Sequence, residues 1–140
     1  MQQSFELKLI DKTSGKLLNA DLECWANQDF NIKLIWDREP LLYSGTDLYE
    51  CLQLCRKRLE GDGIFILCNG SRIDTYPSRQ LRDTSNGVRT YLLEAGKTPS
   101  IILNLLDFTE CNIGTIQEQN NYYKKWKDDL KILLNQQQEG

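Results

Sequence analysis

Residues 18–25 read Leu-Asn-Ala-Asp-Leu-Glu-Cys-Trp, and this stretch decides the first half of the fold. Apolar and polar side chains alternate along it, which is the period-two pattern of a strand with one face in a core and the other in water. Residues 5–9 and 30–36 alternate in the same way on either side of it. Because turn-forming residues fill the gaps at 13–16 and 27–29, the sequence predicts an antiparallel meander of three strands.

We expect Pro40 to end or interrupt this meander, because proline cannot donate a hydrogen bond to a sheet. A helix is predicted after it. Asp47 is placed to cap the first turn of the helix, and Glu50 stands at the spacing of a capping box. Gly61 or Gly63 is expected to end it. Four apolar side chains share one helical face between these ends: Leu48, Leu52, Cys55 and Leu59.

A run of three cations, Arg56-Lys57-Arg58, stands just before the expected end of this helix. Cations at that place interact favourably with the negative end of the helix dipole. We interpret the run as a solvated helix end, and contact with a phosphate group is the alternative.

The middle of the chain is predicted to form a hairpin. Residues 64–68 are a compact apolar run with β-branched and aromatic side chains, which is typical of a central strand. Asn69 and Gly70 follow it, and this dipeptide favours a two-residue hairpin turn. We therefore expect residues 72–76 to return beside residues 64–68 as its second strand.

Two more strands and a long helix complete the predicted fold. The strands are residues 89–93 and 101–108, and a polar loop at 78–88 separates them from the hairpin. A capping box at Thr115 and Glu118 begins the C-terminal helix. Its expected apolar face comprises Ile116, Tyr123, Trp126, Leu130 and Leu133.

Length and composition set the organisation of the chain. It has 140 residues, of which 40% are hydrophobic and 26% are charged, and these are ordinary values for one globular domain. We therefore interpret residues 1–140 as a single domain. The predicted fold class is α+β: an antiparallel sheet of about six strands with one central helix and one long C-terminal helix.

The absence of histidine excludes much of enzyme chemistry. Ser-His-Asp and Cys-His catalysis need an imidazole that changes protonation near neutral pH, and zinc sites of the His₃, His₂Glu and Cys₂His₂ types need one as a ligand. A Cys₄ zinc site is the alternative that remains, but the cysteines do not occur as CxxC pairs. The sequence also lacks a P-loop, a dinucleotide-binding glycine motif in its strand-to-helix context and a nucleophile elbow. We therefore expect no catalytic residues, no cofactor and no metal, and a protein that is not an enzyme.

The five cysteines bear on the compartment in which the chain works. An odd number fits a fully paired disulfide framework badly. Several stand inside apolar runs, as Cys24 and Cys68 do, so we interpret them as reduced thiols of the core. The first residues have neither a basic head nor an apolar stretch of signal length. These observations predict a cytoplasmic protein with no membrane partner.

A local basic patch would be needed to attract an anion, because the net charge of the chain is −3. Residues 69–91 hold four arginines against two aspartates, which gives +2 and leaves −5 for the rest of the chain. Arginine carries a planar fork of donors that suits carboxylate and phosphate groups. A solvated hairpin and loop with locally paired charges is the alternative interpretation. The expected ligand- or partner-binding residues are Arg72, Asp74, Tyr76, Ser78, Arg79, Arg82, Asp83, Arg89 and Tyr91.

Part of this segment resembles a known group of proteins. The pattern consists of Cys68-Asn69-Gly70-Ser71-Arg72, Tyr76-Pro77-Ser78, Arg82-Asp83, Gly87 and Tyr91. It resembles a family of small uncharacterised bacterial proteins, and the resemblance covers about residues 56–96. No activity is known for that family, so the resemblance implies no function.

Three hypotheses about function follow. The first is a non-catalytic protein-interaction module, such as a bacterial immunity or accessory protein that acts by binding a protein partner. The second is a small-ligand or nucleic-acid binder that holds an anion with the arginine-rich segment 69–91. The third is an enzyme that uses Arg, Asp, Tyr or a thiolate. Cys68 is the candidate for the thiolate because it is the cysteine that stands near the arginines.

Overall fold

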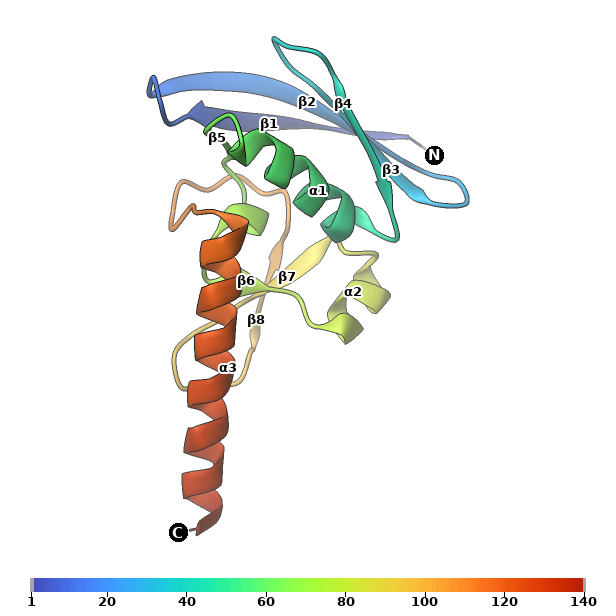
Figure 1. Ribbon diagram of the computed structural model, residues 1–140. Helices are drawn as coiled ribbons and strands as arrows, with labels where there is room; N and C mark the ends of the chain where they lie inside the picture. The colour runs from blue at the N-terminus through green and yellow to red at the C-terminus, as the bar shows by residue number, and fades with distance from the viewer. Residues whose placement is uncertain (1, 140) are drawn as a thin grey trace.

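The chain folds into three layers, as the computed structural model shows for residues 2–139 (Figure 1). A five-stranded antiparallel sheet, with strand order β4-β3-β2-β1-β5, lies on one side of helix α1. A three-stranded sheet, with order β6-β7-β8, lies on the other side with α2 and α3. The elements are β1 (Gln3–Asp11), β2 (Lys16–Ala26), β3 (Phe30–Ile35), β4 (Leu41–Gly45), α1 (Leu48–Glu60), β5 (Ile64–Ile66), the 3-10 turn η1 (Asn69–Ser71), β6 (Thr75–Tyr76), α2 (Arg79–Ser85), β7 (Arg89–Leu92), β8 (Ile101–Asn104) and α3 (Ile116–Glu139).

The predicted fold class is confirmed: the fold is α+β, with antiparallel sheets, a central helix and a long C-terminal helix. The predicted three-stranded meander is also present as β1, β2 and β3, paired in antiparallel register. Leu9, Leu22 and Leu34 on the inner face are completely buried, as the alternation predicts. The prediction of one sheet of about six strands differs from the structure, in which the strands form a five-stranded sheet and a three-stranded sheet.

Strand β4 extends the first sheet beyond the point where Pro40 was expected to end it. Leu41 pairs with Leu34 and Gly45 pairs with Phe30, so β4 lies at the edge of the sheet. Pro40 comes just before the first residue of the strand, where no hydrogen bond from its nitrogen is needed. Proline therefore begins a strand here.

Helix α1 packs the predicted face against the first sheet. Asp47 is its N-cap, and the Glu50 backbone N–H donates to the Asp47 carboxylate at 2.8 Å. The Glu50 carboxylate accepts a hydrogen bond from the Thr46 hydroxyl and does not close the capping box. Gly61 caps the other end. The buried residues on the helix include the predicted set, Leu48, Leu52, Cys55 and Leu59.

The predicted hairpin at Asn69-Gly70 is wrong. These residues lie in the buried turn η1, and β6 pairs with β7 instead of β5. The Asn69 N–H donates to the Asp107 carbonyl at 3.0 Å, and the Gly70 N–H donates to the Leu105 carbonyl at 2.9 Å. Because the peptide groups after β5 hydrogen bond with a distant segment, the chain leaves the first sheet and enters the second.

Arg56 was predicted to lie at a solvated helix end, but it is only 2% exposed. Its Nη1 lies 2.7 Å from the Gln53 Oε1, 2.8 Å from the Gly70 carbonyl and 2.9 Å from the Gln119 Oε1. Its Nη2 donates to the Gly114 carbonyl at 3.1 Å. Burial lowers the pKa of Arg56 from its ordinary value. A single guanidinium group therefore joins α1, η1 and the start of α3.

Helix α3 begins at the predicted capping box. The Thr115 N–H donates to the Glu118 carboxylate and the Glu118 N–H donates to the Thr115 hydroxyl, both at 3.0 Å. The side chain that the helix buries completely is Gln119, 1% exposed, and the predicted apolar face is at most half-buried. The Gln119 Nε2 donates to the Gly70 and Arg72 carbonyls, so a buried amide holds the helix to the turn η1. No helix within residues 2–139 is long and apolar enough to cross a membrane.

Candidate functional site

The arginine-rich segment does not form the polar loop that was predicted for residues 78–88. Residues 79–85 form helix α2, and the Ser78 hydroxyl caps it by accepting from the Leu81 N–H at 3.0 Å. Asn86 ends the helix in the left-handed conformation. The nine predicted binding residues are consequently distributed over β6, α2, β7 and the segments between them.

Arg72 forms an internal ion pair with the carboxylate of Asp74. Its Nε and Nη2 donate to the two oxygens of Asp74 at 2.7 and 2.8 Å, and both side chains are mostly buried. The Asn112 side-chain amide donates to the same carboxylate at 3.0 Å. Burial alone would raise the pKa of Asp74, but the hydrogen bonds from Arg72 and Asn112 outweigh it and lower the pKa. This pair holds two of the Arg72 donors on an internal carboxylate.

Acid should weaken this pair, and Asp74→Asn should show it. A carboxyl group whose pKa is lowered by folding contributes stability above its unfolded pKa, about 3.9, and that contribution is lost as the pH falls through the folded value. We expect the Asp74→Asn variant to be about 1–2 kcal/mol less stable at neutral pH and to lose less stability than wild type below pH 4. Urea denaturation at a series of pH values measures both effects. Parallel curves for the two proteins would contradict the assignment, and Asp83→Asn, at an exposed position, is the control.

Arg82 also forms an internal ion pair, in this case with Asp47. Its Nε and Nη2 donate to the two oxygens of the Asp47 carboxylate at 2.9 and 3.1 Å, and its guanidinium lies 4.8 Å from the centre of the Tyr49 ring. The same carboxylate caps α1. Asp47 therefore already holds the position at the N-terminus of α1 where an external anion would bind.

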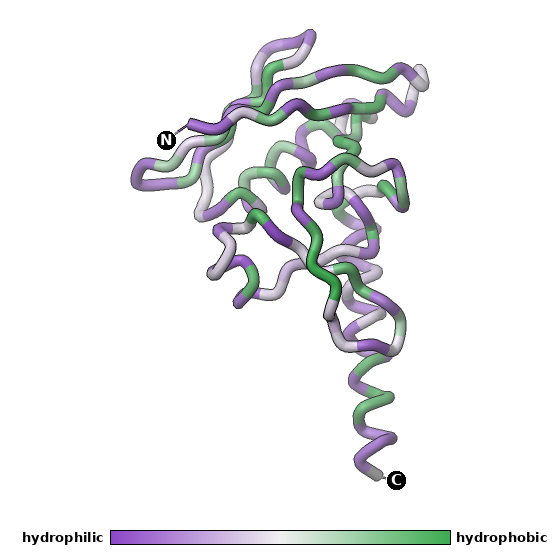
Figure 2. Tube along the Cα trace, turned by 180° about the vertical axis from the view of Figure 1, so that it is seen from behind, coloured by the Kyte–Doolittle hydropathy of each residue, from purple (hydrophilic) through white to green (hydrophobic). Residues whose placement is uncertain are grey.

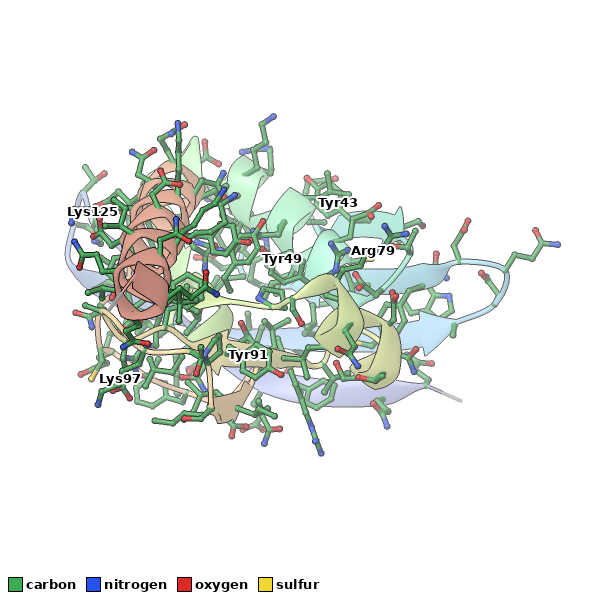
Figure 3. The ribbon with its side chains drawn as sticks, turned by 90° about the horizontal axis from the view of Figure 1, so that it is seen from below. Tyr43, Tyr49, Arg79, Tyr91, Lys97 and Lys125 are labelled. Carbon is green, nitrogen blue, oxygen red and sulfur yellow. The ribbon has the colours of Figure 1, made fainter. Side chains whose placement is uncertain are left out.

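Arg79 and Arg89 are exposed, and neither forms an ion pair within residues 2–139. Arg79 is the first residue of α2, and Figure 3 shows its side chain well apart from that of Tyr91. Arg89 begins β7, and Tyr91 is the cross-strand neighbour of Tyr76. The structure thus separates the four arginines into two internal pairs and two free side chains at different places.

A groove of about 810 Å³ opens between the start of α1, α2 and α3. It contains five of the nine predicted residues, namely Tyr76, Ser78, Arg79, Arg82 and Asp83. Arg72, Asp74, Arg89 and Tyr91 do not line it. Sequence reasoning did not assign the remaining lining residues to the site: Thr46, Asp47, Glu50, Pro77, Asn86 and Tyr123.

A column of aromatic rings runs beside this groove, and two of them, Tyr76 and Tyr123, line it. Tyr76 from β6 stacks on Tyr123 from α3 with their ring centres 3.7 Å apart and their planes 8° apart. Tyr49 from α1 meets the edge of Tyr76 at 6.4 Å, and Trp126 follows Tyr123 at 6.1 Å. Because the rings cover one another, the column joins three elements and leaves little free ring face for a ligand to stack on.

The charges of the groove do not favour an anion. Three carboxylates line it, from Asp47, Glu50 and Asp83, against the guanidinium groups of Arg79 and Arg82. Asp47 and Arg82 neutralise each other, so Arg79 faces two remaining carboxylates. The net charge of the lining is negative, although the predicted segment as a whole is positive.

A second surface is apolar, and its centre is Phe108. This side chain is 59% exposed and stands between two hollows of about 290 and 570 Å³, which share Glu6, Leu106 and Phe108 in their linings. We call the two linings together the Phe108 surface. Figure 2 shows β8 and the hydrophobic chain that follows it running along this back face of the molecule. The other apolar residues of the surface are Phe5, Leu7, Leu17, Cys24, Phe30, Leu48, Leu67 and Val88.

The rim of the Phe108 surface is acidic. Glu6, Asp107 and Glu110 are exposed in it, and none of them forms an ion pair in the described part of the chain. Lys8 is the cation of the rim, and its ammonium group donates to the Asn19 side chain. Sequence reasoning missed this surface because its residues come from separate segments spread between positions 3 and 110. The single local signal was the apolar character of residues 101–108.

The environments of the buried thiols disfavour nucleophilic chemistry. Cys24, Cys51, Cys55 and Cys68 are buried, and Cys111 is exposed, with all five free. Burial raises the pKa of Cys24 and of Cys51 to about 11 and that of Cys55 to about 12, and it also raises the pKa of Cys68. An activated thiolate needs a lowered pKa and access to solvent, so the environment of Cys68 is the opposite of the one that the thiolate form of the third hypothesis requires.

Thiol labelling checks this arrangement. We expect a disulfide reagent at neutral pH to modify one thiol of the native protein rapidly, and all five after denaturation. The Cys111→Ser variant should show no rapid phase, whereas Cys68→Ser should keep it. A rapid phase that disappears in Cys68→Ser would contradict the burial of that thiol.

The chain matches no protein-family model, and no curated protein matches it.

Proposed function

We propose that the chain is a non-catalytic protein-interaction module, an accessory protein that binds its partner through the Phe108 surface. The observation that carries the proposal is the exposed aromatic ridge of Phe108 between two apolar hollows. Apolar patches of this kind on a folded protein mark interaction sites, and aromatic anchors at their centre supply much of the binding energy. Free, mostly buried thiols support a reducing compartment such as the cytoplasm.

The charge of the rim indicates the kind of partner. Glu6, Asp107 and Glu110 surround the apolar centre and have no ion-pair partner within residues 2–139. Complementary charge across an interface increases the rate of association and suppresses wrong partners. The partner therefore presents apolar side chains flanked by lysine or arginine.

Affinity capture from an extract of the source cell tests the proposal with two matched variants. Phe108→Glu places a charge at the centre of the surface, and Leu42→Glu places the same charge on the edge strand β4 at a leucine that is 61% exposed. We expect wild type and Leu42→Glu to retain the same partner and Phe108→Glu to lose it. Equal capture by all three proteins would show that the Phe108 surface is not the binding site.

An anion-binding function is the second candidate, and Arg79 is the observation that favours it. Arg79 lines the groove of about 810 Å³ and forms no ion pair with any described residue. If it binds phosphate groups, inorganic phosphate should shift backbone amide resonances of α2, and Arg79→Ala should abolish the shifts. Arg89→Ala is the control, because Arg89 is exposed but lies outside the groove. Identical titrations for wild type and Arg79→Ala would remove this candidate.

A further inference from the structure

The far end of α3 extends away from the rest of the molecule (Figure 1). The last contacts to the body are hydrogen bonds from the Tyr122 hydroxyl to the Leu93 carbonyl and from the Trp126 Nε1 to the Glu94 carbonyl, followed by Leu133 beside Gly96. We call residues 130–139 the α3 tip. At the rise of an α-helix it is about 15 Å long.

The α3 tip continues the apolar face of the helix into solvent. Leu130 and Leu134 follow Trp126 at four-residue steps, so they lie on the same side of the helix. Leu134 is 43% exposed. Helix formation alone does not require Leu130, Leu133 and Leu134 to follow Trp126 on one face, because large apolar side chains on a helix are favoured by packing. We therefore expect this apolar face of α3 to pack against another surface.

A row of lysines accompanies this apolar face. Lys124, Lys127 and Lys131 stand at positions i, i+3 and i+7, which places them on one side of the helix. All three are exposed, and none forms an ion pair within the range that the structure describes. Three unpaired cations therefore lie along one side of the apolar face of α3, and Lys131 is the one within the α3 tip.

These features match the chemistry of the Phe108 surface, which carries unpaired carboxylates around an apolar centre. We propose that the Phe108 surface of one copy of the chain binds the α3 tip of a second copy. The inference rests on the proposed function and names its partner. The contact joins two different surfaces, so a complex of two copies still presents one free tip and one free Phe108 surface unless the assembly closes.

Two variants that disable opposite sides of the contact test the proposal. Phe108→Glu disables the surface and leaves the tip intact, whereas Leu134→Glu disables the tip and leaves the surface intact. Sedimentation velocity over a series of concentrations should show association of the wild type and a monomer for each variant alone. An equimolar mixture should form a complex of two chains that does not grow further, because each variant supplies the side that the other lacks. Added salt should weaken association, because the contact pairs opposite charges.

Ile132→Glu is the matched control on the same helix. Ile132 is 56% exposed, more than Leu134, but it stands two residues away and faces another side. We expect Ile132→Glu to associate like wild type, as should Leu42→Glu on β4. Circular dichroism of every variant confirms that the comparison is between folded proteins.

Three results would overturn the inference. The first is a wild type that stays monomeric up to millimolar concentration, and the second is a mixture of Phe108→Glu and Leu134→Glu that stays as monomers. The third is a monomer that instead co-sediments with phosphatidylserine-containing vesicles through Leu134. If the wild type is monomeric but captures another protein through Phe108, this inference fails and the proposed function stands. If capture is also independent of Phe108, both fail.

Discussion

Arg56→Ala is expected to lower the free energy of unfolding by about 3–5 kcal/mol, because it leaves several buried acceptors without a donor and each costs about 1–3 kcal/mol. The guanidinium group is 2% exposed and contacts four acceptors from Gln53, Gly70, Gly114 and Gln119. An alanine would leave these acceptors buried without a donor, and water would have to enter to satisfy them. The variant should therefore lose the docking of α3 on α1 before it loses the first sheet.

Arg58→Ala is the matched control for Arg56→Ala. Arg58 lies on the same helix two residues later, and its ion pair with Asp62 is exposed to solvent. We expect the denaturation midpoint of Arg58→Ala to stay close to that of wild type, because exposed ion pairs contribute little. Chemical denaturation followed by circular dichroism measures both variants. Equal losses in the two would show that the position of Arg56 in the network has no special weight.

Gly87→Ala is expected to lower the free energy of unfolding by about 3 kcal/mol or more, for two reasons. Gly87 has a φ of +73°, and placing a side chain in the left-handed region costs about 1–2 kcal/mol. An added Cβ would also lie 2.6 Å from the backbone nitrogen of Tyr49 and 2.7 Å from the Asp47 Cγ. The turn at Asn86 and Gly87 is pressed against the first turn of α1, so backbone would have to move.

Gly15→Ala separates the two effects. Gly15 has the same φ of +73°, but an added Cβ would meet no atom within 4 Å. We expect Gly15→Ala to lower the free energy of unfolding by only the cost of the left-handed backbone, about 1–2 kcal/mol. Thermal denaturation of the two variants gives the difference, which is the cost of the close approach. Equal losses would mean that α2 and its turn can move away from α1 freely.

Local patterns predicted the parts of the fold that depend on neighbours in sequence. The alternation in residues 18–25 and the caps at Asp47 and Thr115 led to the right elements, because strand faces and helix caps are set within a few residues. Asn69-Gly70 misled for the opposite reason. Its turn type is decided by a hydrogen bond from Arg56 to the Gly70 carbonyl and by those that Asn69 and Gly70 donate to carbonyls of residues 105–107. No local pattern reveals these partners.

The candidate site was harder to predict than the fold. The sequence located Arg79, Tyr76 and Ser78 in the groove, because they belong to one continuous segment. It could not show that Arg82 meets Asp47, which stands 35 positions earlier in the chain. Charge counted along a segment gave an anion site, whereas charge counted in space gave an internal ion pair and a net negative groove.

The contacts that hold α3 determine which part of the helix can unfold locally. The Ile116 N–H donates to the Glu60 carboxylate, and Gln119 is buried beside Arg56, so the root of the helix opens only when the core does. The last turns lack such anchors and can unwind alone, because local opening requires little free energy where few contacts are broken. Amide hydrogen exchange along α3 should therefore rise steeply from root to tip. Any protein that docks on the tip would flatten that gradient, and its footprint could be read directly from the exchange profile.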